Sequence, residues 1–467
     1  MIWDTLLSIS RILTVYDKTP IWGLRSLRWK IADSIFVRRI IMSDQDWTFP
    51  YSKSIDPYVD LSSYDAFNQG APFATFARMR KEDPVAWCDM EGGRGFWSIT
   101  RHSDIVKLNS DPATLSSARG IRMEDQTEDE YEARKTFQET DPPEHTHTRM
   151  LMNKAFSPVQ MNKFEDRIRH ITSGLLDSAL AKGEMDATRE IATQLPMRML
   201  GQILGVPEED TEWLVEKGDA LISNTDPDFT DFVLDKVDTD EYRHLPFRSP
   251  AALELFDYAN GLLKRVHAGE DVGVCSMIMQ PNKVGEVMSE DGFRNFFCLA
   301  VAAGNDTTRF SIASTVHALA NQPSLLDQLR EADDKKLYQS ATDEFIRWAC
   351  PTTHFRRTAT HDFEYGGKQI KEGDKVVLWF LSANRDEDVF ESPYEINLTR
   401  RPNKSLSFGQ GGPHVCLGMH LAKLEVRVVL EELAKRVSRI EQTAQHSYLR
   451  SNFILGIKSL PVRMTAI

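Results

Sequence analysis

A glycine-rich loop that contains one cysteine and leads into a helical pattern constrains this chain more than any other feature. The loop spans residues 407–418 and reads SFGQGGPHVCLG, which places its cysteine at position 416. After it, apolar residues recur at helical spacing and predict one face of a helix: Leu417, Leu421, Leu424, Val428 and Leu433. We therefore predict a helix that begins at Leu417, directly after Cys416.

Cys416 would then lie at a helix N-terminus, where free backbone N–H groups and the helix dipole stabilise a thiolate. The glycines would let the backbone pass close under a flat ligand, and His414 could donate to an acidic group at its rim. Such a thiolate suits axial ligation of a haem iron. One alternative is an inert, buried cysteine beside a helix cap. The other, a phosphate-binding loop, fails because no Lys-Ser or Lys-Thr follows the glycines.

A second feature is a long apolar helix with a polar centre. Residues 293–320 predict one helix, and residues 296–303 are apolar all round, which is typical of a buried segment. The sequence GNDTT follows at 304–308 and includes Asp306 and Thr307. We expect either a kink in which Thr307 bonds back to a carbonyl one turn earlier, or a groove that admits dioxygen and water.

Two charged pairs occur at helical spacing. His145 and Arg149 follow two prolines, and four residues separate one from the other on the same face, so they could grip one anionic group. Glu344 and Arg347 also share a face. In isolation, the favoured interpretation of each pair is an ordinary solvated pair, worth under ~1 kcal/mol at a surface.

Together these motifs resemble the cytochrome P-450 family, over roughly residues 45–467. The cysteine loop resembles its haem-binding signature, residues 304–308 its oxygen-activation motif, and Glu344 with Arg347 its Glu-x-x-Arg motif. The resemblance implies a mainly α fold with a small β-rich subdomain. Haem would lie between the long central helix and the helix that follows the cysteine loop.

The resemblance also implies how the cofactor, haem b, is held. Cys416 would supply the thiolate ligand of the iron. Phe408, Gly409 and His414 match the family's loop around it.

Three basic residues elsewhere match positions that bind the haem propionates. His145 and Arg149 match the helix that does so, and Arg357 matches a further arginine, with its neighbour Arg356 as a rival.

By the same resemblance, Thr307 would act at the site of dioxygen activation, and Asp306 would relay protons to it. Glu344 and Arg347 would be buried and joined by Arg400, in a structural role that supports the cysteine loop.

The expected activity is that of a haem-thiolate monooxygenase that hydroxylates a C–H bond of a hydrophobic small molecule. Terpenoid, steroid and fatty-chain compounds are the favoured classes, because residues 296–303, Phe453 and Ile454 predict an apolar pocket. Phe408 lies eight residues before Cys416, where seven is common, and some steroid- and branched-lipid-oxidising bacterial members are similarly lengthened. Alternatives are a peroxygenase that uses hydrogen peroxide and a non-catalytic haem sensor or carrier.

Electrons are expected from a separate ferredoxin or flavodoxin with its reductase, since no flavin or iron–sulphur module is recognisable. Lys423 and Arg427 are candidates for docking an acidic partner, or belong to an ordinary solvated face. Residues 111–140, polar and irregular, resemble the family's variable loop over the substrate. Residues 224–250 match its substrate lid.

Composition narrows the remaining possibilities. The 467 residues contain no linker or repeat, so we expect a single domain over 42–467. Residues 1–41 form a basic extension that either contacts a membrane surface or partner, or is dispensable, with Met42 as the true start.

The formal net charge of −13 argues against nucleic-acid binding. Five scattered cysteines favour a reducing cytoplasm, and no apolar run reaches the ~18–20 residues of a membrane span.

Overall fold

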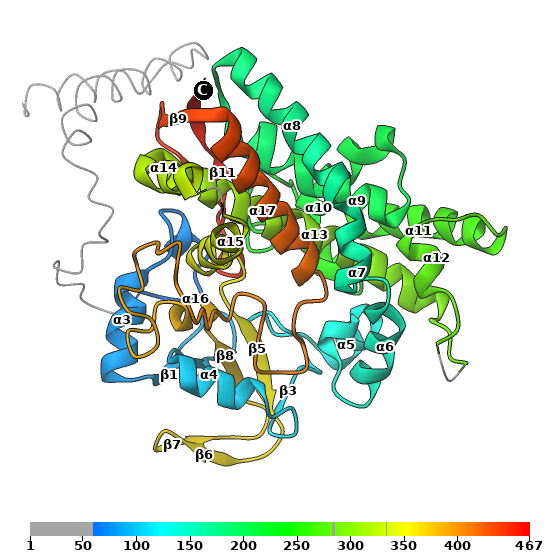
Figure 1. Ribbon diagram of the computed structural model, residues 1–467. Coiled ribbons are helices and arrows are strands. Elements are labelled where there is room, and N and C mark those ends of the chain that lie inside the picture. The colour runs from blue at the N-terminus through cyan, green and yellow to red at the C-terminus, as the bar shows by residue number, and fades with distance from the viewer. Residues whose placement is uncertain (1–58, 283–284, 333) are drawn as a thin grey trace, which may run out of the picture. The chain divides into compact units, whose positions relative to one another are not determined.

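Helices predominate in the part of the chain that the computed structural model describes, residues 59–282, 285–332 and 334–467 (Figure 1). These residues belong to one compact unit. The predicted extension, 1–41, lies outside the described residues, as do residues 42–58, so the domain boundary after residue 41 stays a prediction. No helix of the described ranges is long and apolar enough to cross a membrane.

The helices follow one another along the chain as α3 (Phe73–Glu82), α4 (His102–Asn109), α5 (Glu128–Arg134), α6 (Glu144–Asn153), α7 (Pro158–Met161), α8 (Glu165–Lys182), α9 (Gln194–Leu204), α10 (Thr211–Ile222), α11 (Ala251–His267), α12 (Val274–Ile278), α13 (Glu290–Asn321), α14 (Pro323–Ala332), α15 (Lys335–Ala349), α16 (Phe380–Ala383) and α17 (Met419–Arg436). The strands are β1 (Val85–Cys88), β2 (Phe96–Ile99), β3 (Leu115–Ser116), β4 (Glu184–Asp186), β5 (Phe355–Ala359), β6 (Phe363–Tyr365), β7 (Lys368–Ile370), β8 (Lys375–Leu378), β9 (Val437–Gln442), β10 (Ser447–Tyr448), β11 (Ile457–Ser459) and β12 (Pro461–Ala466).

The largest sheet has the strand order β1-β2-β8-β5-β3. Strands β2 and β8 are parallel, with Phe96 opposite Lys375, and the other pairs are antiparallel. Strands β1 and β2 form a hairpin, with Trp87 opposite Trp97. Successive side chains of a strand point to opposite faces, so Arg356 and Arg357 of β5 face different surroundings.

Helix α13 is the central element and packs against α9, α10, α11, α15 and α17 (Figure 1). It begins where the Ser289 hydroxyl accepts a hydrogen bond of 3.0 Å from the N–H of Gly292. The Thr307 hydroxyl donates to the carbonyl of Ala303 at 2.8 Å, as predicted. Helical structure nevertheless continues without a break through this position.

Helix α17 begins at Met419, two residues later than predicted, with Gly418 at its N-cap. The backbone before it is held by a different contact, because the N–H of Cys416 donates to the carbonyl of Phe408 at 2.9 Å. Such a bond closes the loop instead of extending the helix. Cys416 therefore lies in the loop, three residues before the helix.

Residues 111–140 are more regular than predicted, because they contain α5 and a 3-10 turn, Phe137–Glu139. Each begins with a capping box, Thr127 with Glu130 and Thr136 with Glu139. In a capping box the side chain and backbone of both residues bond reciprocally. The prediction of an irregular segment was wrong here, although the spacing of Thr and Glu was visible in the sequence.

The start of α4 depends on a residue far away in the sequence. The nearest residues of the types that cap helices, Ser103 and Asp104, both lie inside the helix. Instead, the Asp386 carboxylate accepts a hydrogen bond of 2.8 Å from the N–H of His102. Tertiary packing therefore provides what the local sequence does not.

Residues 224–250 are mostly irregular, as predicted, with 3-10 turns at Asp240–Tyr242 and Pro246–Arg248. Asp226, which is fully buried, holds this segment against the β10–β11 hairpin. Its carboxylate accepts from the Lys458 ammonium and from the N–H of Arg450, both at 2.8 Å. The segment is thus tied down by specific polar contacts.

Candidate functional site

A large cavity lies between α13 and the loop that precedes α17. The space that atoms do not fill is about 1390 Å³, with open solvent included. Its lining includes, from α13 and from the loop, Ala300, Ala303, Gly304, Thr307, Phe408, Gly409, His414 and Cys416. The structure therefore brings together Thr307 and four of the predicted loop residues.

The thiol of Cys416 faces this cavity, which is why its side chain is exposed. Burial among protein atoms raises the pKa of Cys416, and N–H groups of Gly418 and Met419 and the charge of Arg149 oppose this. The predicted stabilisation by the helix start is present but is outweighed by desolvation. A metal ion bound to the sulphur would supply the missing stabilisation of the thiolate.

Among the described residues, no group of three or more His, Cys, Asp or Glu side chains could hold a metal ion. A single thiol on a wide cavity does not suit a protein-built metal site. It suits an iron that brings its other ligands with it, as the iron of a porphyrin does.

Glycines shape the loop around Cys416. Gly409 adopts a φ of +70°, which other residues rarely adopt, and its carbonyl accepts from the Asn109 amide at 3.2 Å. A Cβ at Gly412 would lie 2.3 Å from the carbonyl oxygen of Asn109. The loop therefore packs directly against the end of α4, and only glycine fits there.

Four basic side chains gather at one edge of the cavity. Arg149 and His414 line it, and the centroid of the His145 ring lies 4.0 Å from that of His414, with the two rings tilted relative to one another. His145 and Arg357 do not line the cavity but lie next to His414, whose pKa both help to lower. Burial is the main cause of that shift and lowers the pKa of His414 to about 2.

These basic groups lack anionic partners. Within the part of the chain that the structure describes, neither Arg149 nor Arg357 has a carboxylate within ion-pair distance, and they donate to neutral oxygens of Val415 and Asn109. Both ring nitrogens of His145 are buried and have no hydrogen-bond partner there. Burial lowers the pKa of Arg357 to about 10. Buried donors without acceptors are costly, so this edge fits carboxylates that belong to a ligand.

The neighbouring arginines of β5 have separate environments. Arg357 donates to the Asn109 side chain at 3.1 Å, beside the cysteine loop. Arg356 donates to the carbonyl of Glu124 at 3.0 Å, away from His414. Of the two, Arg357 is the one placed at the cavity edge.

The predicted pair of Glu344 and Arg347 is confirmed as a buried cluster with Arg400. Glu344 and Arg347 are fully buried and 2.8 Å apart, and Arg400 lies 3.0 Å from the same carboxylate. Arg347 also donates to the carbonyl of Asn384, whose side-chain oxygen accepts from the N–H of Leu406. The cluster therefore supports the start of the cysteine loop.

Asp306 points away from the cavity that Thr307 lines. Its carboxylate is fully buried, accepts from the Ser223 hydroxyl at 2.8 Å and pairs with Arg309. Arg309 also pairs with Asp219 at 2.8 Å. Burial raises the pKa of Asp306 to about 7, opposed by Arg309 and assisted by Asp219. Asp219 and Arg309 line a separate cavity whose lining is mostly polar and charged side chains, so this cluster connects α13 to a second cavity.

One acidic residue on the cavity wall was missed from the sequence. Glu425 of α17 is buried, and one of its carboxyl oxygens has no hydrogen-bond partner in the described ranges. Burial raises its pKa to about 8. The signal was a glutamate four residues after Leu421, on the apolar face of the predicted helix.

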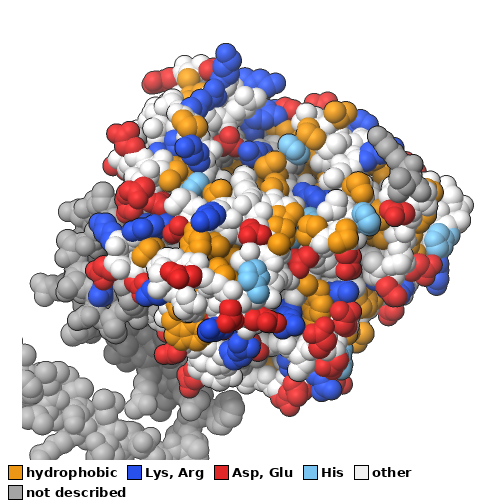
Figure 2. Space-filling model, turned by 90° about the horizontal axis from the view of Figure 1, so that it is seen from below, with side chains coloured by type: hydrophobic (Ala, Val, Ile, Leu, Met, Phe, Trp, Pro, Cys, Tyr) orange, Lys and Arg blue, Asp and Glu red, His pale blue; other side chains and the backbone are white. Residues whose placement is uncertain are grey.

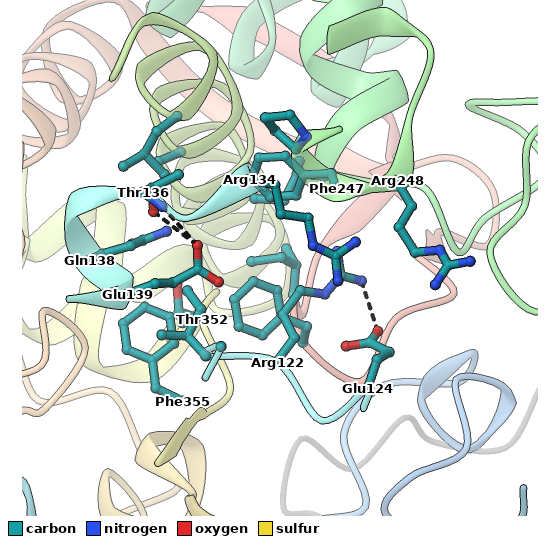
Figure 3. A pocket seen from close by; sticks show the side chains of 18 of the residues that line it. Arg122, Glu124, Arg134, Thr136, Gln138, Glu139, Phe247, Arg248, Thr352 and Phe355 are labelled. Atoms are coloured by element: carbon teal, nitrogen blue, oxygen red, sulfur yellow. Dashed lines mark hydrogen bonds and ion pairs between the residues drawn. The ribbon is translucent and has the colours of Figure 1, made fainter. Parts of the chain in front are cut away.

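A second compartment adjoins the first and shares part of its lining, including Ala303, Thr307 and Phe355. Phe453 and Ile454 also line it, as predicted. Three arginines at its other end were not predicted, and Figure 3 shows them as Arg122, Arg134 and Arg248. They come from residues 111–140 and 224–250, which the sequence identified only as loops near the substrate.

The candidates for partner docking already have partners within the chain. Lys423 pairs with Asp343 at 2.8 Å, and Arg427 pairs with Glu165 at 2.8 Å. The face seen in Figure 2 mixes acidic and basic side chains. The two ion pairs by themselves favour a structural role for Lys423 and Arg427.

Comparison with known proteins identifies the class of protein that this fold and site define. The model of the family "Cytochrome P450" matches residues 66–459. The chain is 34% identical over 412 residues to linalool 8-monooxygenase of Pseudomonas putida, with 86% of this chain and 98% of that protein covered. It is 32% identical over 416 residues to methyl-branched lipid omega-hydroxylase of Mycobacterium tuberculosis, with coverage of 86% and 94%.

A solved structure agrees with these relatives. Mycobacterium marinum cytochrome P450 CYP268A2 in complex with pseudoionone matches with a TM-score of 0.77 and 34% identity, and 88% of this chain and 100% of that chain are covered. The chain belongs to the cytochrome P450 family. It is therefore an oxidoreductase of the monooxygenase type, and its cofactor is haem b.

Proposed function

We propose that this protein is a haem-thiolate monooxygenase that hydroxylates a C–H bond of a hydrophobic terpenoid, steroid or fatty-chain molecule. The observation that carries the proposal is that the thiol of Cys416 and the hydroxyl of Thr307 face one cavity. Apolar side chains such as Leu299 and Phe453 line the adjoining compartment. The names of the relatives, a linalool 8-monooxygenase and a methyl-branched lipid omega-hydroxylase, point to the same substrate classes.

Haem, when bound, supplies the thiolate-ligated iron that activates dioxygen. In our proposal Cys416 is the iron ligand, and the loop around it shapes the surface on which the porphyrin rests. The basic edge of the cavity neutralises the two propionates. The residues that hold the cofactor are Phe408, Gly409, His414, Cys416, His145, Arg149 and Arg357.

Thr307 and Asp306 divide the handling of protons between two sides of α13. The Thr307 hydroxyl, which donates to the carbonyl of Ala303, keeps its oxygen available on the cavity side as an acceptor. Asp306 has a pKa raised to about 7 by burial, so it can both accept and release a proton near neutral pH. Its contacts with Arg309 and Ser223 place it on the side of the polar cavity, from which protons are supplied.

The proposal also includes the electron donor and the cellular location of the protein. We infer a separate ferredoxin or flavodoxin with its reductase as the electron source, and dioxygen as co-substrate. All five cysteines, which are Cys88, Cys275, Cys298, Cys350 and Cys416, are free, which supports a reducing, cytoplasmic location.

The test is the absorbance spectrum of the purified, reduced protein with carbon monoxide, beside Cys416→Ala and Cys298→Ala. Cys298 is buried in α13 and is absent from the lining of the cavity, so its variant is a matched control. We expect a strongly red-shifted Soret band in the wild type and Cys298→Ala only. A band that survives in Cys416→Ala would exclude Cys416 as the ligand, and haem-free wild-type protein would overturn the proposal.

A further inference from the structure

The compartment of Figure 3 has an apolar end and a charged end. About 910 Å³ of its space is not filled by atoms, with open solvent included. The apolar end meets Thr307 and is lined by Leu299, Phe355, Phe453 and Ile454. A hydrocarbon that reaches Thr307 therefore extends toward charged side chains at its other end.

The lining contains more positive than negative charge. Three guanidinium groups, from Arg122, Arg134 and Arg248, face two carboxylates, from Glu124 and Glu139. In the view of Figure 3, Arg134 points into the pocket with Glu139 on one side and Arg248 on the other. Within the lining itself, the positive groups outnumber the negative ones by one.

Most of these charged groups already have partners. Arg122 pairs with Glu124 at 3.3 Å, and Arg248 pairs with Glu130 at 3.3 Å and with an exposed aspartate. The Glu139 carboxylate accepts from the N–H and hydroxyl of Thr136 in its capping box. These contacts commit the groups to holding loops together.

Arg134 is the exception. No carboxylate lies within ion-pair distance of it in the described ranges, and its hydrogen bonds go to neutral oxygens. Its Nε and Nη2 atoms both donate to the side-chain oxygen of Gln126, at 3.1 and 2.8 Å, and Nη1 donates to a backbone carbonyl of the 224–250 segment. Burial lowers the pKa of Arg134, the carboxylates of Glu130 and Glu139 oppose that shift without contacting the guanidinium, and the charge of Arg248 adds to it.

The geometry around Arg134 indicates what would bind there. The edge formed by Nε and Nη2 is one that carboxylates bind with two parallel hydrogen bonds. Gln126 occupies it with one amide oxygen and itself lines the pocket. Charge-assisted hydrogen bonds are roughly twice as strong as neutral ones, so a ligand carboxylate would displace the amide.

We propose that the substrate is an amphipathic monocarboxylate whose carboxylate binds Arg134 and whose hydrocarbon chain extends to Thr307. This inference rests on the proposed monooxygenase function and specifies its substrate class. It places the oxidised carbon at the end of the molecule remote from the carboxylate. It also makes Glu139 an opposing charge that weakens binding of the anion.

The first experiment compares acids with their neutral alcohols. Dissociation constants for dodecanoate, dodecanol, farnesoate and farnesol are measured on the haem-loaded protein by Soret shift and by calorimetry. We expect wild type to prefer each acid by roughly 10–100-fold. Arg134→Gln should lose this preference while its binding of the alcohols is unchanged. Arg243→Gln removes the same charge from an exposed side chain nearby and should keep the preference.

A second variant should gain affinity, which a folding defect cannot imitate. Glu139→Gln removes the opposing charge, and Gln preserves a capping box. We expect each acid to bind roughly 3–10-fold more tightly, because one repulsive charge is gone, and the alcohols to bind as before.

Several results would overturn the inference. These are equal binding of acid and alcohol by wild type, no binding of either acid, or an equal loss of both ligand types in Arg134→Gln. The carbon monoxide spectrum of each variant separates the two proposals. A normal red-shifted band with no acid preference refutes the carboxylate site alone, whereas a missing band in wild type refutes the monooxygenase function.

Discussion

Arginines collect at two places in this molecule, and the two groups differ in what they contact. Beside the cysteine loop, Arg149 and Arg357 donate to neutral oxygens only. At the charged end of the compartment of Figure 3, Arg122 and Arg248 each pair with a carboxylate, and Arg134 does not. An arginine paired within the chain holds the fold together. One that is buried among neutral acceptors costs stability until an anionic ligand arrives.

The same substitution, Arg to Met, should therefore have opposite effects in the two places. Variants of these arginines and of Asp306 test this contrast through haem loss and the free energy of unfolding.

The largest effect is expected for Arg357→Met. Loss of hydrogen bonds to a charged propionate costs roughly 1.5–3 kcal/mol, which corresponds to about 10–100-fold faster loss of haem. In the haem-free protein the same change should raise the free energy of unfolding by ~1–3 kcal/mol, because a buried, uncompensated charge is removed. Haem transfer to an acceptor protein and urea unfolding measure the two effects.

Its matched control is Arg356→Met, on the other face of β5. This variant should retain haem like wild type, since Arg356 donates to Glu124 and Thr358 and not to the cysteine loop. Faster haem loss in both variants would mean that β5 acts as a unit and that the contrast between the two arginines is wrong.

Arg309, which pairs with two carboxylates, contrasts with Arg357, which pairs with none in the described ranges. Arg309 pairs with Asp219 and Asp306, and burial raises the pKa of Asp306 from 3.8 to about 7. The folded state then holds a proton that the unfolded state releases, so this group makes stability fall as pH rises from about 4 to about 7. Its slope is at most ~1.4 kcal/mol per pH unit.

In Asp306→Asn this component of the pH dependence should be absent. The measurement is the free energy of unfolding of both proteins at several pH values in that window. A difference between wild type and variant that does not change with pH would contradict the shifted pKa. Turnover should fall as well, and the deficit should be largest below about pH 7, where the wild-type Asp306 carries the proton that it can donate.

Arg122→Met should destabilise the protein by roughly 1–3 kcal/mol, because it leaves Glu124 without its cation. Burial works to raise the pKa of Glu124, but Arg122 and the hydroxyl of Tyr64 lower it overall. The stabilisation is therefore present above the ordinary carboxylate range and is lost as pH falls through it. Urea unfolding at neutral and acidic pH tests this, and a stabilised variant would refute the contrast with Arg357→Met.

The smallest effect is expected for Arg248→Gln. Arg248 is partly exposed, and one of its partners, Asp240, is on the surface. Such pairs contribute roughly 0.2–1 kcal/mol and are screened by salt. Thermal unfolding at low and high salt should show a small loss that salt reduces. A loss as large as that of Arg122→Met would show that exposure does not govern these pairs.

The features that the sequence predicted well are local ones. Thr307 bonds to a carbonyl four residues earlier, and Glu344 and Arg347 are one helical turn apart. The cysteine loop closes on itself within ten residues, between Phe408 and Cys416. In each case the partners are near one another in the chain, so spacing alone limits the possible geometry.

The features that were missed depend on segments brought together by the fold. The charged end of the compartment of Figure 3 unites Arg134, the last residue of α5, with Arg248 of the irregular 224–250 segment, and neither stretch of sequence shows a periodicity that predicts this contact. The direction of Asp306 depends on which side of α13 meets α10, and a helix that is apolar all round gives no indication of that. The cap of α4 is likewise supplied by Asp386.

The capping box at Thr136 and Glu139 has a consequence for how substrate preference can evolve. Among the common residues, only glutamate and glutamine complete such a box, and their codons differ by a single nucleotide. A lineage can therefore change the charge of the compartment of Figure 3 in one mutational step without losing the turn that contains Glu139. Most other replacements would disturb the loop first, so selection for acidic or neutral substrates would repeatedly return to these two residues.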